Sequence, residues 1–197
     1  NLLSDLSVEQ KAKSWVESLE LKNEDDISFV TTLIYNHLRA VRDWHNNHPY
    51  TMVPEGINPI TGNPLSQLDR QMIINSTMPD EVHQKLMNGL RRVLTEPQVE
   101  AILDKYTVGK VEFTMRGYRD IVPDLTADEE ATILSYLKEA REMAIDYKNM
   151  NQISAIFEIY KTKSEQHLIS NGRNWRQLYK DFVNKVNEEK KQSNNNK

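Results

Sequence analysis

A stripe of apolar residues spaced three and four apart, from Ile27 to His48, is the clearest pattern along the chain. Such spacing keeps the residues on one face of a helix for roughly six turns. The stripe predicts a long helix of an antiparallel bundle, which ends at Pro49 because proline cannot continue the helical hydrogen-bond ladder. Its members are Ile27, Val30, Ile34, His37, Val41, Trp44 and His48.

Helix start signals divide the rest of the chain. The motif Leu-[Ser/Thr]-x-x-[Gln/Glu] begins at Leu6, Leu94 and Leu125. In each copy the hydroxyl can cap a helix N-terminus while the Gln or Glu side chain reaches back to the cap, which makes a capping box. The motif therefore predicts three helix starts, and apolar stripes predict further helices after Pro79, from about Asn151 and from Trp175.

Two segments interrupt the helical pattern. Residues 49–64 form a predicted long loop, because prolines and glycines are concentrated there. Between residues 107 and 116, Val111, Phe113 and Met115 alternate with polar residues, which is the period of an extended chain. A lone strand has no partner, so this pattern predicts an extended crossover and not a sheet.

These elements predict an all-α protein, a bundle-like domain of six to seven helices with a long Pro/Gly loop and a short extended crossover. Residues 1–190 form the predicted single domain. Residues 191–197 are polar and are predicted to be a disordered tail.

Composition narrows the possible functions. The net charge is −4 with acidic and basic residues interspersed, which argues against nucleic acid as a partner, because nucleic-acid binders carry a basic stripe. Cysteine is absent, which excludes a disulfide framework, a thiol nucleophile and thiolate metal sites. No apolar run approaches the roughly 20 residues of a membrane-spanning helix, so we expect no transmembrane segment.

The residues that could carry chemistry fall short of a catalytic or metal site. His45 and His48, with Asp43 nearby, lack the further ligands of a metal site, so we expect no metal and no cofactor. His37 lies on the apolar stripe and is expected to be a hydrogen-bonded core histidine. No nucleophile motif or phosphate-binding loop is present.

Three carboxylates, Glu139, Glu142 and Asp146, follow one another around one predicted helix. A glycosidase places its two carboxylates across a cleft, normally on different elements, so we expect no catalysis from this group. We expect Arg141 to pair instead with Asp120 or Asp124.

The stretch from Leu94 to Tyr147 contains the positions that carry a family resemblance. They are Thr107, Gly109, Val111, Thr114, Tyr118, Pro123, Leu125, Thr126, Leu137, Glu139, Ala140, Arg141, Glu142, Ala144 and Asp146, with the later Phe157, Tyr160, Lys161 and Asn171-Gly172. In these positions the chain resembles a family of uncharacterised secreted or outer-membrane-associated helical proteins from Gram-negative gut bacteria, and it departs from that pattern at Val108 and Met115. The repeated Leu-[Ser/Thr] motif is also similar, over fewer residues, to the LTxxQ motif of periplasmic helical chaperones.

The resemblance implies a non-catalytic component of a carbohydrate-binding or carbohydrate-uptake complex. It implies a periplasmic or outer-membrane-associated location after removal of a leader, with an oligosaccharide or an outer-membrane protein complex as partner. Two alternatives remain open: a periplasmic helical chaperone or adaptor that binds protein clients, and a glycan-active enzyme.

Sugar binding requires exposed aromatic rings beside polar side chains. Trp175 and Tyr106 lie on helical stripes and are expected in the core, whereas Tyr118 and Tyr50 lie in predicted connectors. We expect a site on the crossover and on the helix face behind it. The predicted ligand-binding residues are Tyr118, Arg116, Thr114, Arg141, Glu142 and Tyr50.

Overall fold

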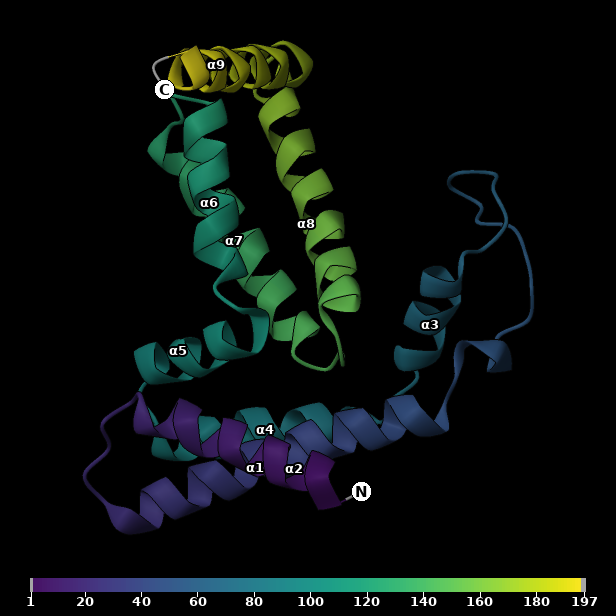
Figure 1. Ribbon diagram of the computed structural model, residues 1–197, viewed down its shortest axis with the longest axis vertical. Coiled ribbons are helices and arrows are strands. Elements are labelled where there is room, and N and C mark those ends of the chain that lie inside the picture. Colours follow the sequence, from purple (N-terminus) through teal and green to yellow (C-terminus); the bar gives the residue numbers. More distant parts are fainter. Residues whose placement is uncertain (1, 196–197) are drawn as a thin grey trace. The chain divides into compact units, whose positions relative to one another are not determined.

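The computed structural model describes residues 2–195, which form nine α-helices and one short 3₁₀ helix (Figure 1). The predicted all-α class is confirmed. The chain folds as two compact units. The first unit contains the described residues up to Val108 together with Ala144–Ser154, and the second contains Gly109–Met143 and the described residues from Ala155 onward. The single domain predicted over residues 1–190 stays a prediction.

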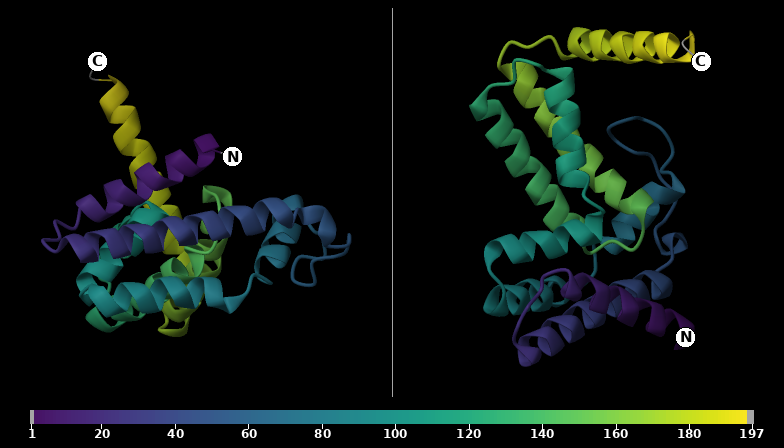
Figure 2. Two further views of the ribbon diagram at one scale, coloured as in Figure 1. Left: turned by 90° about the horizontal axis from the view of Figure 1, so that it is seen from below. Right: turned by 60° about the vertical axis from the view of Figure 1, so that its left-hand side comes forward.

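Four helices build most of the first unit: α1 (Leu2–Glu17), α2 (Glu24–Asn47), α4 (Asp80–Val93) and α5 (Glu96–Thr107). Helix α2 packs against α1 and α4, and Figure 2 shows α2 and α4 side by side. The predicted stripe of α2 faces this core, where Val30 and Ile34 are buried against Leu86 and Leu90 of α4. Burial of each such side chain contributes roughly 1.5–3 kcal/mol to folding.

Helix α1 starts earlier than the motif at Leu6 predicts, so the prediction that Ser7 caps its N-terminus is wrong. Residues 2–6 continue the helix, and Asp5 lies in its first turn, where a negative charge favours the helix dipole. The carboxylate of Asp5 also binds the guanidinium of Arg42 at 2.7 Å, which fixes this turn to α2.

The other two capping boxes are confirmed. The Thr95 hydroxyl accepts a hydrogen bond from the Gln98 amide at 3.4 Å, and the Gln98 side chain accepts one from the Thr95 amide. The same pair of bonds joins Thr126 and Glu129.

The predicted Pro/Gly loop at residues 49–64 is confirmed and leads from α2 to helix α3 (Gln67–Asn75). It contains a 3₁₀ helix (Tyr50–Met52) and an isolated antiparallel bridge between Ile57 and Pro64. The side chain of Asn58 accepts hydrogen bonds from the amides of the next residues, which orders the turn that carries Ile60. Ile60 is 92% exposed.

The second unit contains α6 (Lys110–Ile121), nearly all of α7 (Ala127–Ala144), most of α8 (Met150–Ser170) and α9 (Trp175–Asn195). Its core is formed by buried residues of α6, α7 and α8. The predicted turn at Asn171-Gly172 is confirmed, because Gly172 adopts a left-handed φ of 88° and the next amide bonds back to Leu168. Beyond this turn, α9 crosses one end of the unit and packs against α6 (Figure 1).

The predicted extended crossover at 107–116 is wrong, because α6 occupies most of this segment. The alternation of Val111 and Met115 with polar residues also fits a helical stripe, which continues to Tyr118 and Val122, and these four residues are buried. The break between α5 and α6 is confined to Val108 and Gly109, which have left-handed φ values of 53° and 68°. Helices α6 and α3 explain why the described residues form nine α-helices and not the six or seven that the sequence predicts.

The end of the chain is helical as far as the structure describes it. Helix α9 continues through Asn195, so residues 191–195 of the predicted disordered tail are helical, and 196–197 lie outside the described residues. The glutamate, lysine and glutamine residues near this end favour helix.

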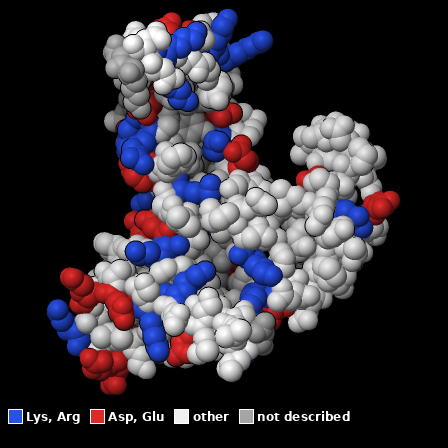
Figure 3. Space-filling view, in the orientation of Figure 1, with Lys and Arg blue, Asp and Glu red and all other residues white. Residues whose placement is uncertain are grey.

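Charged residues of both signs are interspersed on the face drawn in Figure 3. The segment from Tyr50 to Leu68 contains a single charged residue, Glu55, and forms a mostly uncharged surface. Among residues 2–195, none of the helices combines the length and the apolar character that a bilayer crossing needs.

Candidate functional site

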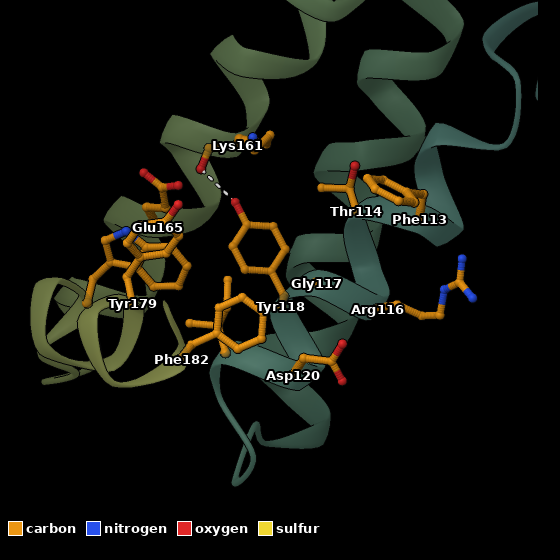
Figure 4. Close-up of a pocket in the computed structure, with 12 residues that line it drawn as sticks. Phe113, Thr114, Arg116, Gly117, Tyr118, Asp120, Lys161, Glu165, Tyr179 and Phe182 are labelled. Atoms are coloured by element: carbon orange, nitrogen blue, oxygen red, sulfur yellow. Dashed lines mark hydrogen bonds between the residues drawn. The ribbon is translucent and has the colours of Figure 1, made fainter. Parts of the chain in front are cut away.

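Helix α6 has one face that is buried in the core and an adjacent face that lines a pocket. Its buried stripe, formed by Val111, Met115, Tyr118 and Val122, packs into the second unit. The adjacent face lines a pocket of about 480 Å³ (Figure 4). Helices α8 and α9 supply the other walls. The lining residues are Phe113, Thr114, Arg116, Gly117, Tyr118, Asp120 and Ile121 of α6, Lys161 and Glu165 of α8, and Trp175, Tyr179 and Phe182 of α9.

Tyr118 lies at the centre of this aromatic pocket. Its hydroxyl donates a hydrogen bond to the backbone oxygen of Lys161 at 3.1 Å, which ties α6 to α8. Burial, and secondarily the charge of Glu165, raises the pKa of the Tyr118 phenol, so the hydroxyl remains protonated and able to donate. The ring is 5.6 Å from the ring of Trp175, centroid to centroid, and tilted by 46°.

Helix α9 contributes three rings because Trp175, Tyr179 and Phe182 recur at helical spacing. The side chain of Asn174 caps this helix by accepting a hydrogen bond from the Gln177 amide at 3.1 Å. The Trp175 and Tyr179 rings lie 6.1 Å apart. The sequence predicted Trp175 in the core, but it lines the pocket. An apolar stripe on a helix has the same spacing whether other helices bury it or it lines a pocket, so the sequence does not distinguish the two.

Three predicted ligand-binding residues, Thr114, Arg116 and Tyr118, meet in this pocket. They do so on a helix and not on the predicted connector. In Figure 4 the Arg116 side chain extends away from Tyr118 and from the rings of α9. Neither Val108 nor Met115, where the chain departs from the pattern it resembles, lines the pocket.

The other three predicted residues do not line it. Arg141 and Glu142 lie on α7, and Arg141 is buried. Tyr50 belongs to the first unit, where its ring packs against the guanidinium of Arg70 at 5.2 Å. Asp124, proposed as a partner of Arg141, instead binds Arg173 at 2.7 Å.

A polar network lies within the first unit. His37 is buried, as predicted, and its ring nitrogens contact the Tyr106 hydroxyl at 3.0 Å and the Asp146 carboxylate at 2.9 Å. His83 contacts the other Asp146 oxygen at 2.6 Å. Helix α7 ends at Ala144, so the prediction that Asp146 lies on the same helix as Glu139 and Glu142 is wrong. Burial is the largest single influence on the pKa of Asp146 and raises it. The hydrogen bonds and charges of His37 and His83 together outweigh burial, so the pKa of Asp146 is lowered.

The histidines considered for metal binding are engaged elsewhere. The Nδ1 atom of His45 lies 3.2 Å from the Gln152 amide nitrogen and 3.4 Å from that of Asn75, while Nδ1 of His48 lies 2.7 Å from the backbone oxygen of Trp44. Burial lowers the pKa of His45. In the described part of the chain, no three His, Cys, Asp or Glu side chains are grouped to hold a metal ion.

The fold is all-α, and the second unit carries an aromatic-lined pocket. The family described as "Protein of unknown function (DUF3826)" matches residues 6–188, and the chain belongs to this family. Comparison with curated proteins gives no match.

Proposed function

We propose that this protein is a non-catalytic carbohydrate-binding protein and that the aromatic pocket of the second unit holds the sugar. The observation that carries the proposal is the convergence of five aromatic rings with polar side chains on one pocket of about 480 Å³. Small-molecule sites combine an apolar lining with a few placed polar groups in this way.

The chemistry of the lining suits a sugar. Pyranose rings present a face of C–H groups that packs on an aromatic ring, and their hydroxyls bond to polar groups at the edge. Among the side chains in residues 2–195, none is hydrogen-bonded to Trp175 Nε1 or to the Tyr179 hydroxyl. Both groups therefore remain available to a ligand.

Gly117 supports close approach of a ligand to α6. It lies within the helix and lines the pocket, and a Cβ atom built on it meets nothing within 4 Å. Glycine inside a helix costs about 0.5–1 kcal/mol relative to alanine, and packing against neighbours does not require it here. The open space beside its backbone suits the flat face of a sugar ring.

Calorimetric titration with oligosaccharides first identified on a glycan array tests this function. Trp175→Ala is expected to weaken binding about tenfold or more, because it removes a stacking surface, and Trp175→Phe is expected to retain part of it. Tyr50→Ala, which removes an aromatic ring from the first unit, serves as the control. Equal affinity in wild type and in folded Trp175→Ala, or no binding to any glycan, would overturn the proposal.

The proposed setting is a carbohydrate-uptake complex in the periplasm or at the outer membrane. The resemblance to exported proteins linked to glycan uptake supports it, and an oligosaccharide or an outer-membrane protein complex is the proposed partner. Cell fractionation of the native host, with antibody detection, tests the location. Detection only with cytoplasmic markers would contradict it.

Catalysis on glycans is a second candidate, favoured by one observation. Asp120 and Glu165 come from different helices and line the same pocket. Glycosidases use two carboxylates separated by about 5–9.5 Å around the scissile bond. Prolonged incubation of the protein with a bound oligosaccharide, followed by chromatography, is expected to give no new reducing ends. Product formation that Glu165→Gln abolishes would establish the enzyme instead.

A protein-binding adaptor is a third candidate, favoured by the ordered loop that exposes Ile57 and Ile60. Apolar side chains fixed in an exposed turn are typical of protein contacts. If the adaptor function holds, the protein suppresses aggregation of a denatured client enzyme, and Ile57→Ser/Ile60→Ser loses this effect. Equal suppression by wild type and variant would exclude this loop as the client site.

A further inference from the structure

The charged residues of the aromatic pocket are not balanced. The Lys161 ammonium donates to the Glu158 carboxylate at 2.8 Å, so its charge is already matched outside the lining residues. Arg116 is exposed and extends away from the rings (Figure 4). Asp120, one helical turn further along α6, is exposed as well, so the formal charges of Arg116 and Asp120 offset each other. Glu165 has no hydrogen bond or ion pair with any side chain of residues 2–195. The charge that remains unmatched at the pocket is therefore the negative charge of Glu165.

Glu165 is the more enclosed of the two carboxylates. It is half-buried on α8, and desolvation together with the charge of Glu158 raises its pKa, while Lys161 opposes the rise. It lines the same pocket as Tyr118 and the rings of α9 (Figure 4). A half-enclosed carboxylate without a donor gains free energy when a ligand supplies a positive charge or a hydrogen bond.

The aromatic rings favour the same kind of ligand. The faces of Trp and Tyr rings carry partial negative charge and attract ammonium groups by about 0.5–2 kcal/mol, depending on solvent exposure. Trp175 lies between Tyr118 and Tyr179 in the ring series, at 5.6 and 6.1 Å. The rings and Glu165 thus act in the same direction, toward cations and against acidic sugars.

We propose that the pocket selects sugars that carry a protonated amino group, with Glu165 as the counter-ion and the Trp175 and Tyr179 rings as the stacking surface. This inference rests on the proposed function, since it specifies the class of sugar bound at the same pocket. A neutral sugar can satisfy Glu165 through a hydroxyl, but only a cation neutralises it and also interacts electrostatically with the ring faces.

The test compares two β-1,4-linked glucosamine tetramers by calorimetry with the full chain at pH 6, one with free amines and one fully N-acetylated. The free-amine tetramer is expected to bind about tenfold or more tightly than the acetylated one. Added sodium chloride is expected to reduce this preference, because it screens partly exposed charges.

Glu165→Gln is expected to bring the ratio of the two affinities close to one. Glu188→Gln, which changes an exposed glutamate on α9 outside the pocket, is the matched control and is expected to keep the wild-type ratio. A melting curve for each variant shows that it is folded.

Two results would overturn the inference and separate it from the proposed function. Equal binding of the two tetramers, or tighter binding of the acetylated one, contradicts cation selection while leaving carbohydrate binding in place. An unchanged preference in Glu165→Gln removes Glu165 as the counter-ion. Absence of binding by both tetramers and by every other glycan on the array overturns both proposals together.

Discussion

At the scale of single residues, several buried polar side chains in this protein are matched to partners far away in the sequence. His37 is an example: its burial followed from its place on the apolar stripe, and that prediction is confirmed. Its partners Tyr106 and Asp146 lie 69 and 109 positions away, and no local pattern identifies them. Burial can therefore be predicted from periodicity, but the identity of a hydrogen-bond partner depends on the tertiary fold.

Glu129 gives a pH-dependent prediction. It is buried in the second unit, and the guanidinium of Arg173 binds it at 2.7 Å, which, with the Thr126 cap, lowers the pKa of Glu129 to about 2. Because the folded pKa lies below the ordinary value of 4.5, this pair stabilises the protein above pH 4.5 and its contribution is lost as the pH falls toward 2. Glu129→Gln is expected to lower the free energy of unfolding at pH 7 by about 3 kcal/mol.

The measurement is urea unfolding of wild type and Glu129→Gln from pH 7 to pH 2. The difference between them is expected to shrink as the pH falls below 4.5. Asp128→Asn, an exposed neighbour in the same helical turn, is the control and is expected to change little. A difference that is constant with pH would contradict the assigned ion pair.

Asp146 gives the corresponding prediction in the first unit. Its two carboxylate oxygens contact His37 and His83, so Asp146→Asn leaves both imidazoles without a charged acceptor and one of them without an acceptor oxygen. The expected loss is about 2 kcal/mol or more in the free energy of unfolding. Chemical denaturation measures it, with the exposed Asp25→Asn as control. Equal stability of Asp146→Asn and wild type would show that the network contributes nothing to folding.

At the scale of elements, α6 shows where sequence patterns are ambiguous. Val111 and Met115 are four residues apart, a spacing compatible with both a period of two and a helix, and Phe113 between them made the extended reading attractive. In the structure Phe113 is 69% exposed and lines the pocket, so it did not belong to the buried face. Long stripes such as that of α2 are unambiguous because six turns contain enough positions to separate the two periods.

The two helical glycines, Gly117 and Gly89, predict opposite responses to alanine. A Cβ at Gly117 meets open space, so Gly117→Ala is expected to raise the free energy of unfolding by about 0.5–1 kcal/mol while weakening ligand binding. A Cβ at Gly89 would clash with the Leu33 side chain of α2, so Gly89→Ala is expected to destabilise by about 1 kcal/mol.

Thermal unfolding and calorimetric titration of both variants check this pair. If Gly117→Ala is more stable but binds the ligand more weakly, the glycine serves ligand binding and not folding. Unchanged affinity in a stabilised Gly117→Ala would mean that the ligand does not approach the α6 backbone.

At the scale of the whole molecule, the sequence predicts the helical class and most helix positions, but it does not assemble the pocket. Capping boxes and stripes are local, and they locate α2, α5, α7 and α9 from neighbouring residues alone. The pocket combines rings from α6 and α9 with a carboxylate from α8, elements that are separate along the chain. Tyr118 and Thr114 were among the positions of the resemblance, and Arg116 was predicted as a polar side chain near Tyr118, whereas the place of Trp175 and Tyr179 in the pocket required the fold.

The three tryptophans allow the most direct test of the proposed carbohydrate site. Trp15 and Trp44 belong to the first unit and Trp175 lines the pocket. In an NMR titration with the tightest-binding oligosaccharide, observed through the indole N–H signals and assigned by single Trp→Phe variants, we predict that the Trp175 signal shifts in a saturable way while the other two stay in place. A shift confined to Trp15 or Trp44, or no shift at saturating sugar, would contradict the proposed site.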